Sequence, residues 1–173
     1  MPGINLTSIE AADRSAILKI DNYKVDLDLT TSDETFYSKA VITFNAKPGS
    51  DTFIDAVAKR IISATLNGVA VDVSNYDGES IFLKNLAEQN TLIIEMEAIY
   101  SKTGEGLHRF VDPADGEVYL YSQHQANDSR RTFASFDQPD LKATYEFQVI
   151  APSKWEVISN TPVTERKDLG KDR

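Results

Sequence analysis

The feature that most constrains the fold is a two-residue alternation of apolar and polar side chains, which recurs in three separate segments. These segments run from Tyr23 to Leu29, from Phe36 to Phe44 and from Leu92 to Ala98. A period of two places the apolar side chains on one face of a β-strand and leaves the other face in water. The pattern therefore predicts half-buried strands rather than a helical bundle.

Turn signals between the apolar runs predict how the strands are connected. The polar run from Thr30 to Glu34 separates the first two strands, so we expect them to form an antiparallel hairpin. Asn67-Gly68 separates the apolar runs 61–66 and 69–73. Both turn residues accept positive φ, which a two-residue hairpin requires. The second pair is therefore also predicted to be a hairpin.

The remaining segments predict two short helices and three more strands. A capping box, Thr7 to Glu10, begins a helix that is expected to end near Ala16. A second short helix is predicted near 127–136, where Asn127 or Asp128 would act as the cap. Further strands are predicted over 117–121, 144–150 and 155–159. Many short strands with little helix predict an all-β class, as a sandwich or an open barrel-like sheet.

Composition narrows the expected compartment and partners. The chain has 173 residues, which is the size of one domain, and it contains no cysteine. The net charge of −9 repels nucleic acid phosphates and anionic membranes, so neither is expected as a partner. The N-terminus lacks the basic start and apolar stretch of a secretory signal, and no apolar run is long enough to span a bilayer. We therefore expect a cytoplasmic protein.

One long polar segment interrupts the β pattern. It spans Gly104 to Phe147 and is rich in Gly, Asp, Arg, His and Gln, with aromatic residues between them. Connections between strands are usually short, and long polar ones commonly carry function. This segment is therefore the first place to look for a functional surface.

Three groups of residues within this segment resemble a known family, the N-terminal domain of the aminopeptidase N (M1) zinc metallopeptidases. They are Tyr121-Ser122-Gln123-His124-Gln125, Arg130-Arg131-Thr132-Phe133 and Phe136-Asp137-Gln138-Pro139-Asp140-Leu141-Lys142-Ala143. The resemblance implies a saddle-like β-sandwich of mostly antiparallel strands over residues 1–163. It also implies that residues 164–173 form a charged tail at the junction with a catalytic domain.

The resemblance also implies what the parent protein does. Members of this family are zinc-dependent aminopeptidases, in which a zinc-bound water attacks the first peptide bond of a peptide substrate. The present sequence has no His-Glu-x-x-His and no Gly-x-Met-Glu-Asn. We therefore expect this chain alone to be inactive and to bind no zinc. Its expected partners are the catalytic domain of the same polypeptide, packed against an apolar patch near Tyr119, Tyr121 and Phe136, and the peptide substrate.

Gln123 and Gln125 are the candidate substrate-binding residues. If both lie on one strand, alternation places their side chains on the same face, with His124 on the other. Two neutral amides so placed can hydrogen-bond a peptide carbonyl and an amine, but the residues also fit a polar strand end that merely faces water. Gln123 matches the family's glutamine, which implies contact with the first residue of the substrate. Gln125 stands where many members carry a glutamate, and in this respect the chain is similar to the branch containing leukotriene hydrolase and aminopeptidase B.

The other chemically capable residues fit structural roles better. His108 and His124 lack the one-turn helical spacing of a zinc site, so neither is expected to be a ligand. The polar residues that follow His124 are expected to form a buried Arg–Asp corner: Arg130, Arg131, Asp137 and Asp140. Trp155 is expected in the core or at a domain interface.

Two other interpretations remain open at this point. An exposed Trp155 on a sandwich would favour a stand-alone binding module with a carbohydrate or protein ligand. A naturally truncated relative that acts as a scaffold is the third possibility.

Overall fold

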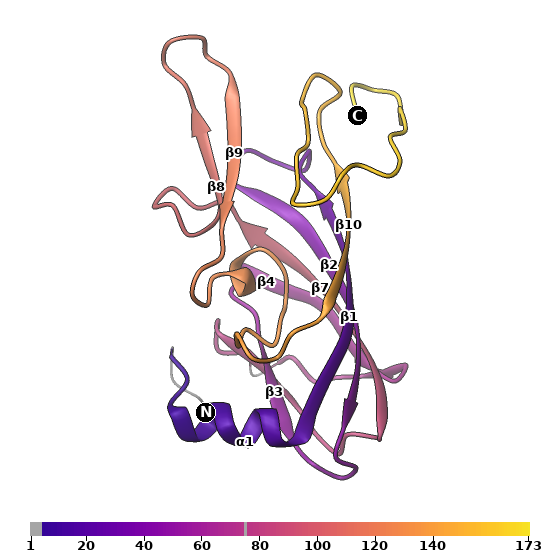
Figure 1. Ribbon diagram of the computed structural model, residues 1–173. Coiled ribbons are helices and arrows are strands. Elements are labelled where there is room, and N and C mark those ends of the chain that lie inside the picture. Colours follow the sequence, from indigo (N-terminus) through magenta and orange to yellow (C-terminus); the bar gives the residue numbers. More distant parts are fainter. Residues whose placement is uncertain (1–4, 75) are drawn as a thin grey trace.

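The computed structural model describes residues 5–74 and 76–173, and a six-stranded sheet is its main element (Figure 1). The order of strands across the sheet is β10-β1-β2-β7-β4-β5, with every pair antiparallel except β1 and β10. The strands of this sheet are β1 (Leu18–Asp28), β2 (Thr35–Ala46), β4 (Arg60–Leu66), β5 (Val69–Ala70), β7 (Gln89–Ile99) and β10 (Thr144–Ile150).

Two smaller sheets and two helical segments complete the described residues. β3 (Thr52–Asp55) pairs with β6 (Ser80–Leu83), and β8 (Gly106–Val111) pairs with β9 (Val118–Gln123). The helical segments are the α-helix α1 (Ser8–Ile17) and the 3₁₀ turn η1 (Ser129–Arg131). The predicted all-β class with a short N-terminal helix is therefore confirmed.

The core forms on the face of the large sheet that alternation predicts. On β7, Leu92, Ile94, Met96 and Ala98 are all at most 1% exposed. The residues between them are only partly buried, as expected for the outer face of a sheet. Side chains from the β3–β6 pair and from the segment 133–141 cover the inner face and complete the core.

The predicted Asn-Gly hairpin is present, although its second strand is short. Asn67 and Gly68 have φ values of 53° and 79° and connect β4 to β5. The Asn67 side chain accepts a hydrogen bond from the Thr91 amide at 2.8 Å, which ties the turn to β7. β5 ends at Ala70, three residues before the predicted end of the strand.

Helix α1 begins as predicted, and its chain continues directly into β1. The Glu10 amide donates to the Thr7 hydroxyl at 3.2 Å, and the Thr7 amide donates to the Glu10 carboxylate at 2.9 Å, which completes the capping box. The helix lies at the end of the molecule opposite the β8–β9 hairpin (Figure 1). Its buried polar residue is Arg14.

The prediction of a helix near 127–136 is wrong beyond its first turn. Only η1 is helical, and the Asp128 side chain bonds the Arg131 guanidinium at 2.8 Å instead of capping the turn. The chain then extends because Ser135 exchanges two backbone hydrogen bonds with Asp55, at 2.9 and 3.0 Å. Phe136 is buried in this extended part of the chain.

The strand predicted over 155–159 is also wrong. These residues are all described by the structure and make no ladder with a neighbouring strand. A strand needs a hydrogen-bonding edge beside it, and apolar alternation alone does not supply one. Trp155 in this segment is half-buried and does not belong to the core.

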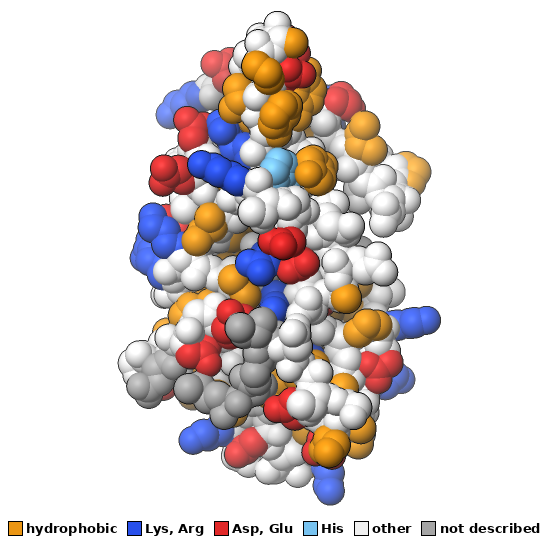
Figure 2. Space-filling view, turned by 90° about the vertical axis from the view of Figure 1, so that its left-hand side faces the viewer, with side chains coloured by type: hydrophobic (Ala, Val, Ile, Leu, Met, Phe, Trp, Pro, Cys, Tyr) orange, Lys and Arg blue, Asp and Glu red, His pale blue; other side chains and the backbone are white. Residues whose placement is uncertain are grey.

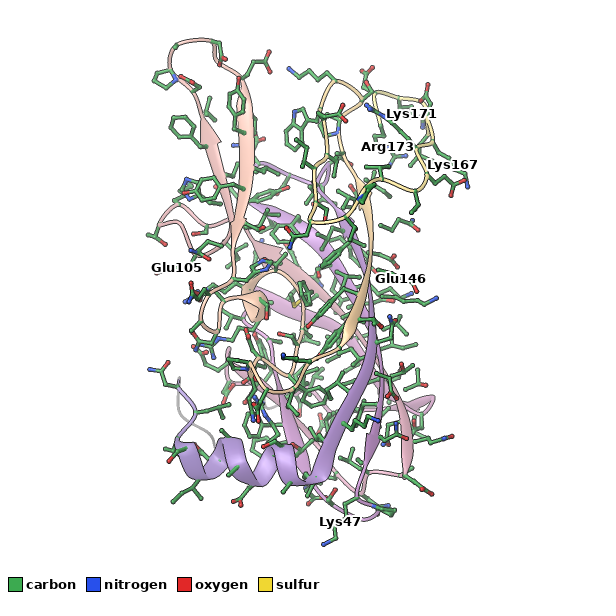
Figure 3. The ribbon with its side chains drawn as sticks, viewed as in Figure 1. Lys47, Glu105, Glu146, Lys167, Lys171 and Arg173 are labelled. Atoms are coloured by element: carbon green, nitrogen blue, oxygen red, sulfur yellow. The ribbon has the colours of Figure 1, made fainter. Side chains whose placement is uncertain are left out.

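The C-terminal segment after β10 is mostly exposed and lies at the same end of the molecule as the β8–β9 hairpin (Figure 1). Residues 164–173 are all exposed, and Lys167, Lys171 and Arg173 lie in this segment (Figure 3). An ion pair between Lys154 and Glu117 joins the segment to the hairpin. In the ranges 5–74 and 76–173, no helix is long and apolar enough to cross a membrane.

Candidate functional site

The two candidate glutamines lie at the end of β9, but they do not share a strand. Gln123 is the last residue of β9, and Gln125 lies in the turn that follows. The expectation of two side chains on one strand face is therefore wrong, because the ladder with β8 stops at the Gly106–Gln123 pair. The two residues are close together because a turn follows β9, and not because their side chains alternate along one strand.

A hydrogen bond joins the two glutamines directly. The Gln125 backbone amide donates to the Gln123 side-chain carbonyl at 3.1 Å, and both residues are exposed. The peptide bond between Gln125 and Ala126 is cis. Both side chains are neutral carboxamides with donor and acceptor atoms, and both residues are exposed.

His124, between the glutamines, points into the protein. Its Nε2 atom lies 3.1 Å from the Thr132 hydroxyl, and its ring packs edge-on against Phe133 with centroids 6.0 Å apart. Burial lowers the pKa of His124, and the charge of Asp128 partly offsets this shift. The Asp128 amide also donates to the His124 carbonyl at 3.1 Å, which closes the turn.

In the predicted Arg–Asp corner, Arg130 and Asp137 are held by hydrogen bonds and an ion pair. Arg130 is 4% exposed, and its amide donates to the Asp137 carboxylate at 3.0 Å. Its guanidinium lies 3.3 Å from the Glu79 carboxylate. Burial raises the pKa of Asp137. Asp140, in contrast, is exposed, so the corner is built from fewer residues than the sequence suggested.

Sequence reasoning missed the most buried ion pair of the domain. The Arg14 guanidinium donates to the Asp55 carboxylate at 2.8 Å and to the Gln138 side-chain carbonyl at 2.9 Å. These partners are 41 and 124 positions away from Arg14 along the chain. No local spacing in the sequence signals such a contact.

An aromatic face of the β8–β9 hairpin continues from Gln123. Tyr121 lies two residues before Gln123 on β9 and packs on His108 with ring centroids 4.8 Å apart. Tyr119 and Phe110 form the next pair on this face, and Tyr119 and Tyr121 are both about half exposed. Hydrophobic side chains gather over this hairpin at the top of the view in Figure 2.

The expected apolar patch is therefore present at the tyrosines but does not include Phe136. That side chain is 3% exposed and packs against Phe44 with ring centroids 5.2 Å apart. A second exposed apolar surface lies instead on β10, where Tyr145 and Phe147 are 48% and 46% exposed. Their rings are stacked, at 6.1 Å and 7°.

The described residues do not fit a zinc site. No group of three or more His, Cys, Asp or Glu side chains in the ranges 5–74 and 76–173 is arranged to hold a metal ion. The two histidines have other contacts, His108 with Tyr121 and His124 with Thr132.

A wide groove on another part of the surface is a less suitable candidate site. It has a volume of about 790 Å³ and lies between the β4–β5 hairpin and β6. Its walls are mainly apolar, from residues that include Leu66, Val71, Tyr76 and Phe82. Its lining includes none of the residues from Gly104 to Phe147, so it is separate from the glutamine turn.

Comparison with known proteins relates the chain to aminopeptidases. It is 48% identical to an aminopeptidase N of Streptomyces lividans over 173 aligned positions, which cover 97% of this chain and 20% of that protein. It is 29% identical to a glutamyl aminopeptidase of Rattus norvegicus over 103 positions, which cover 58% of this chain and 10% of that protein. The chain thus spans about a fifth or less of these relatives.

Solved structures show the same fold. Aminopeptidase A of Legionella pneumophila, solved with aspartic acid, matches with a TM-score of 0.74 and 21% identity, over 90% of this chain and 19% of that one. Yeast LTA4 hydrolase, solved with bestatin, matches with a TM-score of 0.64 and 15% identity, over 78% of this chain and 23% of that one. The sequence pattern of the family described as the Peptidase M1 N-terminal domain matches residues 19–173. This chain therefore belongs to the family of N-terminal domains of M1 peptidases.

Proposed function

We propose that this chain is the non-catalytic N-terminal domain of a zinc-dependent aminopeptidase, and that its glutamine turn forms part of the substrate-binding wall. The observation that carries the proposal is the hydrogen-bonded pair of Gln123 and Gln125, which is exposed at the end of β9. The residue between them, the partly buried His124, contacts Thr132 and ties the turn to the protein. The relatives are aminopeptidases, and the chain corresponds to a fifth or less of their length. The catalytic residues and the zinc ion would then belong to the remaining part of the polypeptide.

The chemistry of the turn suits the N-terminal residue of a peptide. Such a residue offers an ammonium group, which donates hydrogen bonds, and a carbonyl, which accepts them. A carboxamide has one acceptor and two donors, so the pair of Gln123 and Gln125 can serve both groups. Because a neutral amide attracts an ammonium group less strongly than a carboxylate does, Gln125 would orient the amine while carboxylates elsewhere carry most of its binding energy.

The exposed apolar surfaces support a catalytic domain as the partner within the same polypeptide. Tyr145 and Phe147 on β10 are stacked and half exposed, although they lie on the side of the sheet that faces the core. Exposed aromatic side chains in a contiguous group are typical of a surface that another domain covers. We assign this surface to the catalytic domain.

The test is a comparison of matched glutamine variants in the full-length polypeptide. We expect Gln123→Ala to raise KM and lower kcat for an aminoacyl reporter amide, because both binding and positioning of the substrate are lost. Gln89→Ala is the control, since Gln89 is also exposed but lies at the start of β7. If the two variants have the same kcat/KM as the unmodified enzyme, the glutamine turn does not line the active site.

A further inference from the structure

We infer that Arg14, on helix α1, is a positioning residue for the Gln123–Gln125 turn, to which it is connected by hydrogen bonds through the segment 130–137. The inference rests on the proposed function, because it assigns Arg14 to the site that the two glutamines form. Helix α1 precedes the residues 19–173 that match the family pattern. The role of Arg14 therefore follows from its contacts alone.

Arg14 is buried and held by contacts on several sides. The residue is 2% exposed, and its guanidinium lies over the Phe53 ring at 4.7 Å from the centroid. It donates to Asp55 at 2.8 Å and to Gln138 at 2.9 Å. The Gln138 amide in turn donates to the Ala11 carbonyl at 2.8 Å, so the contact closes back onto α1. A buried charge held from several directions has little freedom to move.

Asp55 is hydrogen-bonded to the segment that follows the turn. The Asp55 oxygen that binds Arg14 also accepts a hydrogen bond from the Asp137 amide at 3.1 Å. The Asp137 carboxylate then accepts from the Arg130 amide at 3.0 Å. Two carboxylates thus fix both ends of the segment 130–137, and Arg14 is the cation that binds the first of them.

The segment 130–137 also contacts His124, the residue between the two glutamines. Thr132, inside the segment, contacts the His124 ring through its hydroxyl at 3.1 Å. The amide of Asp128 donates to the His124 carbonyl at 3.1 Å. Because His124 lies between Gln123 and Gln125, its contacts hold the backbone that carries both glutamines. A shift of the segment 130–137 would therefore move the site.

Loss of Arg14 should act on this segment more than on the large sheet. Without the guanidinium, the Asp55 carboxylate, whose charge contributes to the raised pKa of Asp137, would lose its cation. The nearby Arg130 already pairs with Glu79. Two nearby buried carboxylates repel each other. The ladder between β2 and β7 does not use Arg14, so its hydrogen bonds should remain.

The experiment uses the full-length polypeptide with three variants. Arg14→Met removes the charge and the hydrogen bonds, Arg14→Lys keeps the charge, and Arg60→Met is the control, because Arg60 also forms a salt bridge but is exposed on β4. We expect Arg14→Met to raise KM for an aminoacyl reporter amide roughly three- to tenfold and to lower kcat, both in the same direction as Gln123→Ala. Arg14→Lys should lie between Arg14→Met and the unmodified enzyme, and Arg60→Met should be silent.

Hydrogen exchange gives a second readout that does not depend on activity. In Arg14→Met, and to a lesser degree in Arg14→Lys, the amides of residues 124–137 should exchange faster while those of β7 keep their protection. Faster exchange throughout the large sheet would show a general structural role and overturn the inference. So would unchanged exchange at 124–137. If Gln123→Ala leaves KM unchanged, the proposed function fails, whereas the exchange measurement still decides whether Arg14 holds the turn.

Discussion

Removal of one buried hydroxyl group should measure how strongly the sheet holds the segment that supports the site. Tyr23 on β1 is 1% exposed, and its hydroxyl oxygen accepts a hydrogen bond from the Phe136 amide at 3.0 Å. Tyr23→Phe keeps the ring, which stacks on Tyr145 with centroids 4.9 Å apart. The substitution therefore removes the hydrogen bond and little else.

The expected cost follows from the buried amide that is left without its partner. An unsatisfied buried donor costs about 1–3 kcal/mol. We therefore expect Tyr23→Phe to lower the free energy of unfolding of the 173-residue chain by about 2 kcal/mol. With a urea m-value of about 2 kcal/mol/M, the midpoint of unfolding would fall by about 1 M at an unchanged slope.

Tyr119→Phe is the matched control for this measurement. The Tyr119 hydroxyl also forms a hydrogen bond, to Asp115 at 2.9 Å, but the residue is 51% exposed, so water can replace the bond. We expect its effect to stay within about 0.5 kcal/mol. Equal shifts for the two variants in urea unfolding, followed by circular dichroism, would refute the reasoning that burial makes the Tyr23 hydrogen bond valuable.

Three more predictions concern a glycine, a carboxylate and the site. Gly106→Ala should destabilise the chain more than Gly116→Ala in urea unfolding, because both residues have positive φ but only at Gly106 would the new Cβ lie 2.7 Å from a side-chain atom, the Cβ of Arg131. Hydrogen bonds from two basic side chains lower the pKa of Glu97 to about 2. The contribution of Glu97 to stability is therefore present above pH 4.5 and is lost as the pH falls toward 2. In acid unfolding, the Glu97→Gln variant should not show this fall in stability. Gln125→Glu in the full-length enzyme should lower KM, by an amount equivalent to about 1 kcal/mol of binding free energy, because a carboxylate binds the substrate ammonium group more strongly than an amide does. Steady-state kinetics at neutral pH would show no change if Gln125 does not face the substrate.

Local patterns predicted those elements whose causes are local. The alternation in 92–98 placed Leu92 and Met96 in the core, and Asn67-Gly68 placed a hairpin, because a strand face and a two-residue turn depend on neighbouring residues only. The prediction that Gln123 and Gln125 share a strand was wrong, because alternation cannot show where a ladder ends. β9 ends at Gln123, opposite the first residue of β8, Gly106, so its length is limited by the strand with which it pairs.

Contacts between distant parts of the chain were beyond the reach of sequence patterns. Nothing near Arg14 indicates that it binds Asp55 and Gln138, because the geometry that joins them exists only after the sheet has formed. The apolar residues of β10 predicted a strand but not its parallel pairing with β1. The family resemblance pointed to the glutamine turn, whereas the support beneath that turn became visible only in three dimensions.

The parallel pairing of β10 with β1 has a consequence for the order in which the protein can be built. Asn22 pairs with Thr144, and Asp28 pairs with Ile150. One edge of β1 therefore stays unpaired until residues more than a hundred positions later in the sequence have been synthesised. During synthesis this edge carries unpaired backbone groups beside the buried face of a hairpin, and such an edge is open to pairing with other chains. A ribosome-bound chain shortened to end before Thr144 should therefore associate with other copies more readily than one that includes β10.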